Sequence, residues 1–184
     1  MSQWGNAFAG RGKTTKILIG INVLVYLAQI ASGGPITGLL ELDTNYVWSA
    51  PWTLLTSGFA HSTLNFLHIL LNMYSLWIFG EAIEEVFGSK KFVRLYLASI
   101  LGGSLAYVFF DSGSVLGASG GVFGLMGAYF IMIRAMGLRS NQMLGLIAIN
   151  VIIGFVPGSH TAVTAHLGGL VAGAAIAWSY TRRR

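Results

Sequence analysis

Long apolar runs separated by short polar segments dominate the chain. Six runs cover residues 17–31, 61–79, 92–110, 115–133, 143–156 and 161–180. A helix of about 20 apolar residues is long enough to cross the hydrocarbon core of a bilayer, and the fifth run is short by this measure. The pattern predicts an all-α membrane protein built as a bundle of six transmembrane helices.

The first run allows two interpretations. It follows the basic segment 1–16 and contains Asn22 and Gln29, so it suits a membrane helix only if both polar side chains face the protein. A secretory signal peptide also combines a basic start with an apolar core of this size. We expect a retained helix, because the number of downstream helices then balances the topology.

A long connection follows the first run. Residues 32–60 show no clear periodicity and contain no Lys or Arg, but they carry Tyr46, Trp48 and Trp52. Aromatic rings of this kind favour the headgroup level of a bilayer, and so long a connection is unusual unless it has a function. We expect it to be functional or to lie in the membrane interface.

The composition agrees with a membrane protein. Hydrophobic residues make up 54% of the 184 residues and charged residues only 9%, against roughly 25% charged residues in a soluble domain. The length predicts one membrane domain, residues 1–184. The absence of cysteine excludes disulfides and thiolate chemistry, and nothing in the sequence implies a metal or an organic cofactor.

Topology accounts for the net charge of +5. All 11 Lys and Arg residues fall in the segments 1–16, 80–94, 134–142 and 182–184, which six spans place on one side of the membrane. Such positive segments stay in the cytoplasm. We therefore expect a multi-pass protein of the inner or plasma membrane with both termini in the cytoplasm, and no nucleic-acid partner.

Three polar residues fall at one depth in different runs. His68, Ser119 and His166 lie about seven, four and five residues into the second, fourth and sixth runs, which share one direction. At about 1.5 Å per helical residue, all three lie just below the outer face. Ionisable residues inside a membrane generally mark a functional site, and serine beside histidine suits a nucleophile with its general base.

Packing is a competing explanation for each residue alone. A lone histidine, or Asn72, often bonds helices together, and small residues usually mark tight packing. His61 and His160 lie at the edges of runs, so we expect them to be solvated and without a role. No acidic residue lies at the depth of Ser119, so catalysis would use a Ser–His dyad without a carboxylate.

Glycines predict that the fourth and sixth runs approach each other closely. They are Gly117, Gly120, Gly121, Gly124 and Gly127 in the fourth run, and Gly168, Gly169 and Gly173 in the sixth. Helix backbones can touch at such residues, which would bring His166 within roughly 2.6–3.2 Å of Ser119. Phe123 shares a helical face with Ser119 and could pack on the imidazole.

The motifs in this order resemble those of the rhomboid proteases, a family of intramembrane serine proteases. Residues 117–120 match the family's G-x-S-G, 165–169 its A-H-x-x-G region, 68–72 its H-x-x-x-N and 80–89 the turn after its second helix. The resemblance covers nearly the whole chain. It implies a rhomboid-like bundle of the bacterial type that has only the six-helix core.

The resemblance also implies roles for individual residues. Ser119 would be the nucleophile and His166 the general base. The Ser119 backbone N–H, His68 and Asn72 would form the oxyanion hole, and Phe123, Gly117 and Gly120 would support the site. Two positions depart from the family pattern: Thr53 follows Trp52 where many members have arginine, and Phe123 replaces a tyrosine.

The implied activity is cleavage of peptide bonds in or near transmembrane segments of other membrane proteins, inside the lipid bilayer and without a cofactor. The alternative is a catalytically silent relative that binds client helices, against which Ser119 and His166 are both intact. A small transporter is a third possibility, but the sequence shows no clear inverted repeat. The sequence leaves the native substrate and the oligomeric state open.

Overall fold

Helices make up most of the chain in the computed structural model, which describes residues 12–154 and 162–182. The α-helices are α2 (Lys13–Ser32), α3 (Pro35–Leu40), α4 (Thr53–Thr56), α5 (Phe66–Phe87), α6 (Ser89–Phe110), α7 (Ser119–Ala135), α8 (Asn141–Gly154) and α9 (Val163–Thr181). A short 3-10 helix, η1 (Ser57–Phe59), and two strands, β1 (Leu42–Asp43) and β2 (Ser114–Val115), complete the described elements.

Several helices have the length and composition of membrane spans. Within the described residues, α2, α5 and α6 are long and apolar enough to cross a bilayer, whereas α7 and α8 are apolar but shorter. Large apolar side chains such as Leu24, Leu71 and Ile152 are exposed on the helix surfaces, where lipid tails would cover them. The six-span count remains a prediction.

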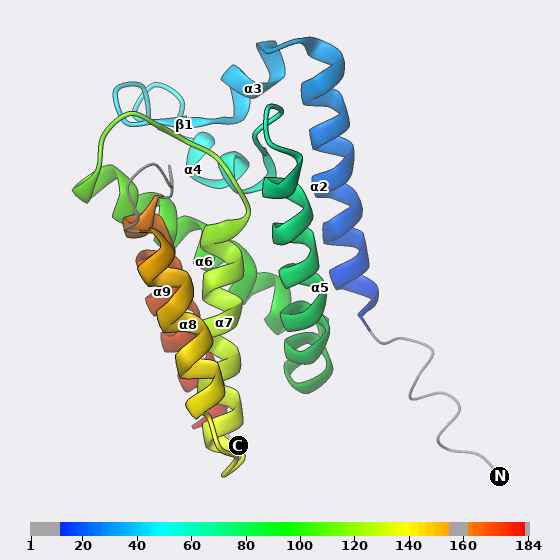
Figure 1. Ribbon diagram of the computed structural model, residues 1–184, viewed down its shortest axis with the longest axis vertical. Helices are drawn as coiled ribbons and strands as arrows, with labels where there is room; N and C mark the ends of the chain where they lie inside the picture. Colours follow the sequence, from blue (N-terminus) through cyan, green and yellow to red (C-terminus); the bar gives the residue numbers. More distant parts are fainter. Residues whose placement is uncertain (1–11, 155–161, 183–184) are drawn as a thin grey trace, which may run out of the picture.

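The polar residues of α2 face the protein, as predicted. Asn22 and Gln29 are both buried, and α2 packs along α5 (Figure 1). The Asn22 amide donates to the Leu18 carbonyl at 2.8 Å. The Gln29 amide donates to the His61 carbonyl at 3.1 Å, and its oxygen accepts from the His61 N–H at 2.9 Å. Gln29 therefore fixes the chain that leads into α5.

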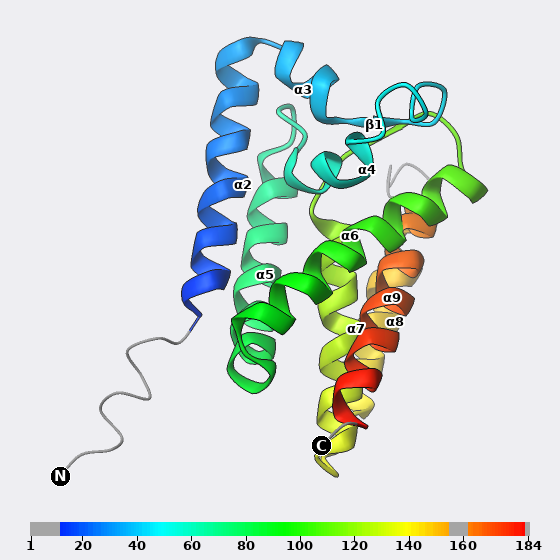
Figure 2. The ribbon, with the colours of Figure 1, turned by 180° about the vertical axis from the view of Figure 1, so that it is seen from behind.

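The connection after α2 is more ordered than its sequence pattern suggested. It folds into α3, β1, α4 and η1, which lie across one end of the bundle (Figures 1 and 2). Strand β1 pairs with β2 in antiparallel register, Leu42 with Val115 and Asp43 with Ser114. The small sheet, which the all-α prediction lacked, attaches this connection to the segment that begins α7.

The charged segment 80–94, which separates the second and third apolar runs in the sequence, is almost entirely helical. Helix α5 continues to Phe87 and α6 begins at Ser89, so only Gly88 separates them. Gly88 has a φ of 82°, a conformation that glycine adopts without strain. The acidic residues therefore project from the end of α5.

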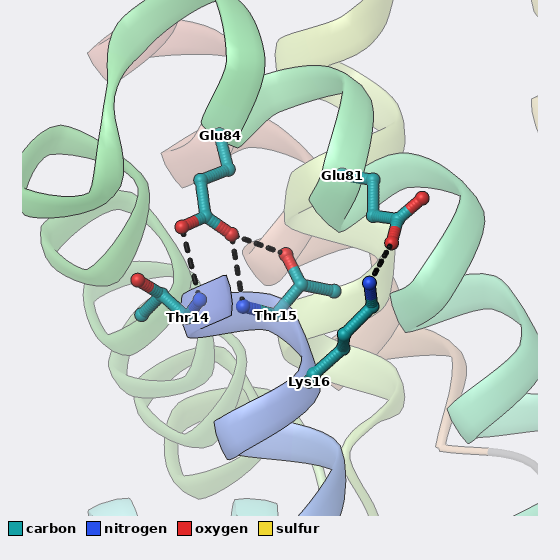
Figure 3. Close-up of polar contacts among 5 residues, drawn as sticks. All are labelled: Thr14, Thr15, Lys16, Glu81 and Glu84. Atoms are coloured by element: carbon teal, nitrogen blue, oxygen red, sulfur yellow. Dashed lines mark hydrogen bonds and ion pairs between the residues drawn. The ribbon is translucent and has the colours of Figure 1, made fainter. Parts of the chain in front are cut away.

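Glu84 uses that position to bind the start of α2 (Figure 3). Its carboxylate accepts hydrogen bonds from the Thr14 N–H at 3.0 Å, the Thr15 N–H at 2.9 Å and the Thr15 hydroxyl at 2.8 Å. The Ser89 hydroxyl donates to it at 2.7 Å. Orphan N–H groups at a helix start are thus satisfied by a buried carboxylate.

Helix α7 lies at the centre of the bundle and contacts α5, α6, α8 and α9. Its most extensive contact is with α9, which in turn packs on α6 (Figure 2). A Cβ atom at Gly169 would overlap the Gly120 carbonyl, and one at Gly173 would overlap the Gly124 carbonyl. The predicted glycine contact between the fourth and sixth runs is therefore present, and no larger residue fits it.

Candidate active site

Ser119 is the first residue of α7, not a residue one turn inside a helix as its place in the fourth run suggested. The preceding residues form β2 and a turn in which Gly117 has a φ of 138° and donates its N–H to the Ser57 carbonyl at 2.9 Å. The first intrahelical bond runs from Val122 N–H to the Ala118 carbonyl. The N–H groups at this helix start consequently have no intrahelical acceptor.

His166 lies beside Ser119 across the α7–α9 contact. The distance from its Nε2 to the Ser119 Oγ is 2.9 Å, within the range expected from the glycine pattern. The imidazole is buried, and its Nδ1 has no hydrogen-bond partner within the described residues. No carboxylate therefore bonds the ring among these residues, and the Ser–His dyad stays a prediction.

Phe123 contacts the other surface of that imidazole. The two ring centroids are 4.2 Å apart and the planes differ by 13°, so the rings are stacked. Phe123 follows Ser119 by one helical turn, which places both side chains on one face of α7. The stacking restrains the ring in the absence of a hydrogen bond to Nδ1.

His68 and Asn72 lie on one face of α5 next to the serine. The His68 Nδ1 accepts the Ser62 N–H at 3.2 Å, which leaves Nε2 as the proton-bearing nitrogen in the neutral ring. A Cβ on Gly117 would lie 2.7 Å from that Nε2. The Asn72 amide donates to the His68 carbonyl at 2.8 Å, so it is bound to its own helix here.

Glycine is required at one of the two supporting glycine positions, Gly117. Gly117 combines a φ of 138° with the close approach of His68, and a side chain at that position would be strained in both respects. Gly120 has the Ala165 carbonyl and Gly103 as its nearest neighbours. Gly117 therefore lets His68 come close to Ser119, whereas a Cβ on Gly120 would make only ordinary contacts.

The expectation that His61 is solvated is wrong. The side chain is fully buried in the chain before α5, and its ring centroid is 5.3 Å from that of His68. Its position at the edge of a run did not reveal that the segment folds inward, held by Gln29. His160 lies outside the described residues.

Burial also changes the ionisation of His61. Burial and the nearby His68 lower the pKa of the His61 imidazole to about 3, and a polar contact with the Phe59 backbone offsets only part of that effect. Neither ring nitrogen makes a hydrogen bond of standard geometry within the described residues. His61 is therefore neutral, and its ring packs against that of His68.

A cavity of about 550 Å³ brings the predicted site residues together. Its lining includes His68, Asn72, Ser119, Phe123 and His166. Within the described residues, no group of three or more His, Cys, Asp or Glu side chains is arranged to hold a metal ion. The arrangement offers a hydroxyl, an imidazole acceptor and nearby N–H donors, which are the groups that acyl transfer uses.

Two residues that shape this site were not predicted from the sequence. Ser57 accepts the Gly117 N–H, and Gln29 holds the main chain of His61. The polar character of Gln29 within an apolar run indicated that it faces the protein, but not which segment it binds. Nothing in the sequence pattern around Ser57 indicated its contact.

Comparison with known proteins agrees with the motifs. The family model described as "Rhomboid domain" matches residues 49–183. The chain is 32% identical over 178 residues to rhomboid protease GluP of Bacillus subtilis, covering 89% of this chain and 34% of GluP. It is 30% identical over 192 residues to rhomboid protease GlpG of Haemophilus influenzae, covering 95% of this chain and 93% of GlpG.

Several relatives are much longer than the matched region. The chain spans about a third of the length of GluP and 41% of that of RHOMBOID-like protein 6 of Arabidopsis thaliana, to which it is 34% identical over 130 residues, 66% of this chain. The apolar helices indicate a membrane protein, and the family model that matches most of the chain describes a membrane-protein family. This integral membrane protein belongs to the rhomboid family of intramembrane proteases.

Proposed function

We propose that this chain is an intramembrane serine endopeptidase that uses Ser119 as nucleophile and His166 as general base. The observation that carries the proposal is the 2.9 Å contact between His166 Nε2 and Ser119 Oγ inside a cavity of the bundle. The imidazole accepts the hydroxyl proton as Oγ attacks the substrate carbonyl. It then returns that proton to the leaving amine, and water hydrolyses the acyl-enzyme.

The developing oxyanion is bound by three donors in this proposal. The Ser119 backbone N–H is available at the start of α7, where it has no intrahelical acceptor. His68 Nε2–H lies next to Gly117 on the adjacent side of the cavity. The Asn72 amide leaves the His68 carbonyl and turns to the oxyanion, so it donates to the oxyanion only when substrate is present.

Orientation of His166 depends on packing in this mechanism. A carboxylate performs that task in Ser-His-Asp triads, whereas here the stacked ring of Phe123 occupies one face of the imidazole. The tyrosine hydroxyl that many relatives carry at this position is absent, but the ring is retained. Gly117 supplies the space that His68 occupies beside the serine, and Gly120 lies against the Ala165 carbonyl of α9.

Membrane proteins are the proposed substrates. A helix hides its carbonyl groups in its own hydrogen bonds, so the substrate segment must unwind before Ser119 can attack it. This requirement favours segments with small or helix-breaking residues near the scissile bond. The relatives named rhomboid protease support this class of substrate, and no cofactor takes part.

The proposed location is the inner or plasma membrane. Six spans with all Lys and Arg residues on one side place both termini in the cytoplasm. The starts of α5, α7 and α9, which carry the site residues, then lie near the extracytoplasmic face. Water from that side reaches the acyl-enzyme.

Cleavage of a membrane reporter in proteoliposomes tests this function. We expect the wild-type protein to cut a transmembrane reporter, and both Ser119→Ala and His166→Ala to be inactive with unchanged melting temperatures. Ser179→Ala is the matched control, because that hydroxyl donates to the Ile176 carbonyl of its own helix at 2.7 Å. Equal cleavage by Ser119→Ala, or no cleavage of any transmembrane reporter by the folded wild type, would favour the silent client-binding alternative.

A further inference from the structure

The cavity at Ser119 continues well beyond the residues used for catalysis. Along α5 its lining extends from His68 to Phe79, and along α7 from Ser119 to Met126. At about 1.5 Å per residue, these stretches correspond to roughly 16 Å and 10 Å of helix. Helix α8 borders the same cavity through Leu146 and Asn150. The cavity is therefore a groove that continues along the helices away from the site.

Most side chains in the far part of this groove are apolar, but two small polar ones break the pattern. Ser75 lies on α5, three residues after Asn72 and seven after His68, so it shares their helical face. Asn150 lies on α8. Both line the cavity, and neither belongs to the proposed chemistry.

The hydroxyl of Ser75 has no hydrogen-bond partner in the part of the chain that the structure describes. Serines in membrane helices usually donate to a carbonyl of the preceding turn, as Ser99 does to Leu95 at 2.7 Å and Ser179 does to Ile176 at 2.7 Å. Ser75 makes no such bond within the described residues. Its hydroxyl is consequently free to bond a molecule in the groove.

Asn150 is only half satisfied. Its amide donates to the Leu146 carbonyl at 2.8 Å, but its side-chain oxygen has no partner within the part of the chain that the structure describes. Helix α8 contacts α7 and α9 but makes no comparable contact with α5. An acceptor on α8 and a hydroxyl on α5 thus line one groove from elements that do not pack together.

Polar groups at membrane depth are costly unless a partner satisfies them. We propose that Ser75 and Asn150 form a specificity site for a hydrogen-bonding side chain (Asn, Gln or Ser) in the transmembrane segment of the substrate, beyond the bond that Ser119 cleaves. The groove is continuous with Ser119, so a segment whose carbonyl reaches the serine extends past both residues. This inference rests on the proposed protease function and names the substrate feature that the groove selects.

The position of that side chain follows from the length of α5. Ser75 lies about 10 Å along the helix from His68. An extended substrate covers this distance in about three residues and a helical one in about seven. The selected side chain therefore lies three to seven residues from the scissile bond, on the side that enters the membrane.

Paired transmembrane reporters in proteoliposomes test the site. One series carries a single Asn at each position from three to seven beyond the cleaved bond, in an Ala/Leu segment, and the matched series carries Leu there. We expect wild-type protein to cleave the best Asn reporter with a kcat/KM about threefold to tenfold above its Leu counterpart, as single intramembrane hydrogen bonds allow. Ser75→Ala and Asn150→Leu should each bring this ratio close to one, whereas Ser179→Ala should not.

Two results would overturn the inference. One is a ratio near one at every position in the wild type, and the other is a wild-type ratio that survives in the double variant Ser75→Ala/Asn150→Leu. Either leaves cleavage by Ser119 intact and therefore does not affect the proposed function. Binding of the same peptides to Ser119→Ala, measured by fluorescence quenching, reads the selectivity without turnover. Equal affinities for Asn and Leu peptides in that assay would also reject the site.

Discussion

The His166 imidazole is held by a serine and an aromatic ring. Ser119 bonds its Nε2 at 2.9 Å, and Phe123 stacks on its face at 4.2 Å. Its Nδ1, where a triad would place a carboxylate, has no partner within the described residues. Such packing limits the motion of the ring, and its Nε2 faces the hydroxyl whose proton it accepts in the proposed mechanism.

Two side chains on α5 provide a prediction about the oxyanion. Asn72→Ala and His68→Ala should each lower kcat by roughly 10²–10³, because each removes one donor to the developing charge. The double variant should lose less than the sum of the two effects in free energy, since both groups serve one oxygen. Steady-state kinetics on one transmembrane reporter, with melting temperatures alongside, measures this. Loss of stability with unchanged kcat would assign the pair to packing.

His61 provides a prediction about pH. Its pKa is lowered to about 3 in the folded protein, whereas the unfolded chain has the usual value of about 6.5. Below pH 6.5 the unfolded state binds a proton that the folded state does not, so stability falls by about 1.4 kcal/mol per pH unit until pH 3 is approached. The melting temperature should therefore decrease from pH 7 to pH 5.

Replacing His61 by Gln removes the titrating group and keeps the main-chain bonds to Gln29. We expect a flatter dependence of melting temperature on pH in this variant, with the buried His68 and His166 still present in both proteins. An identical slope for the two proteins would show that other groups control acid sensitivity.

For individual residues, the sequence predicted which polar side chains of the helices lie close together better than it predicted the environment of residues in connections. Counting residues along the runs grouped Ser119, His166 and His68. This worked because all three lie near the start of a helix, where the residue count gives the depth along the helix axis. The same counting failed for His61, which lies in a connection whose inward fold depends on Gln29. Contacts between distant loops have no periodic signature in the sequence.

At the scale of elements, the contact between α7 and α9 positions the site. Backbone approaches backbone at Gly120–Gly169 and Gly124–Gly173, so the helices lie close enough for the Ser119 and His166 side chains to meet. The glycine spacing predicted this contact from sequence alone, since small residues leave few alternatives. The start of α7 was not predictable in the same way. The apolar run begins at residue 115, but the helix begins only at Ser119, after the turn in which Gly117 bonds the Ser57 carbonyl.

A matched pair of glycine variants tests this contact. Gly173→Ala should destabilise the protein by about 1–3 kcal/mol, because the added Cβ overlaps the Gly124 carbonyl. Gly145→Ala on α8 has open space around its Cβ and should be neutral or stabilising by up to about 1 kcal/mol through helix propensity. Thermal unfolding in one detergent compares them. Equal stability of both variants would mean that α9 can move away from α7 without cost.

At the scale of the whole molecule, α2 is attached to the rest of the bundle at both of its ends. Gln29 binds the connection before α5, and Glu84 binds Thr14 and Thr15 (Figure 3). The connection 32–60 was predicted to be functional or interfacial, and it covers the end of the bundle near the site (Figure 1). Its folded form depends on the β1–β2 pairing, which was not predictable because strands of two residues are too short to show an alternating pattern.

The two acidic residues of α5 in Figure 3 provide a comparison. Glu84→Gln should destabilise the protein by about 2–4 kcal/mol, because it removes a buried charge that accepts several hydrogen bonds. Glu81→Gln breaks only a partly exposed ion pair with Lys16 at 3.6 Å and should cost less than about 1 kcal/mol. Denaturation in mild detergent ranks the two. The reverse order would contradict the role given to Glu84.

Covalent labelling tests most directly whether His166 activates Ser119 for attack on a carbonyl, as we propose. Wild-type protein in proteoliposomes is treated with a fluorophosphonate probe, digested, and analysed by mass spectrometry to locate the adduct. We expect one phosphonylated residue, Ser119, with labelling abolished in Ser119→Ala and strongly slowed in His166→Ala. A folded wild-type protein that remains unlabelled at Ser119, or labels equally fast without His166, would contradict the proposal.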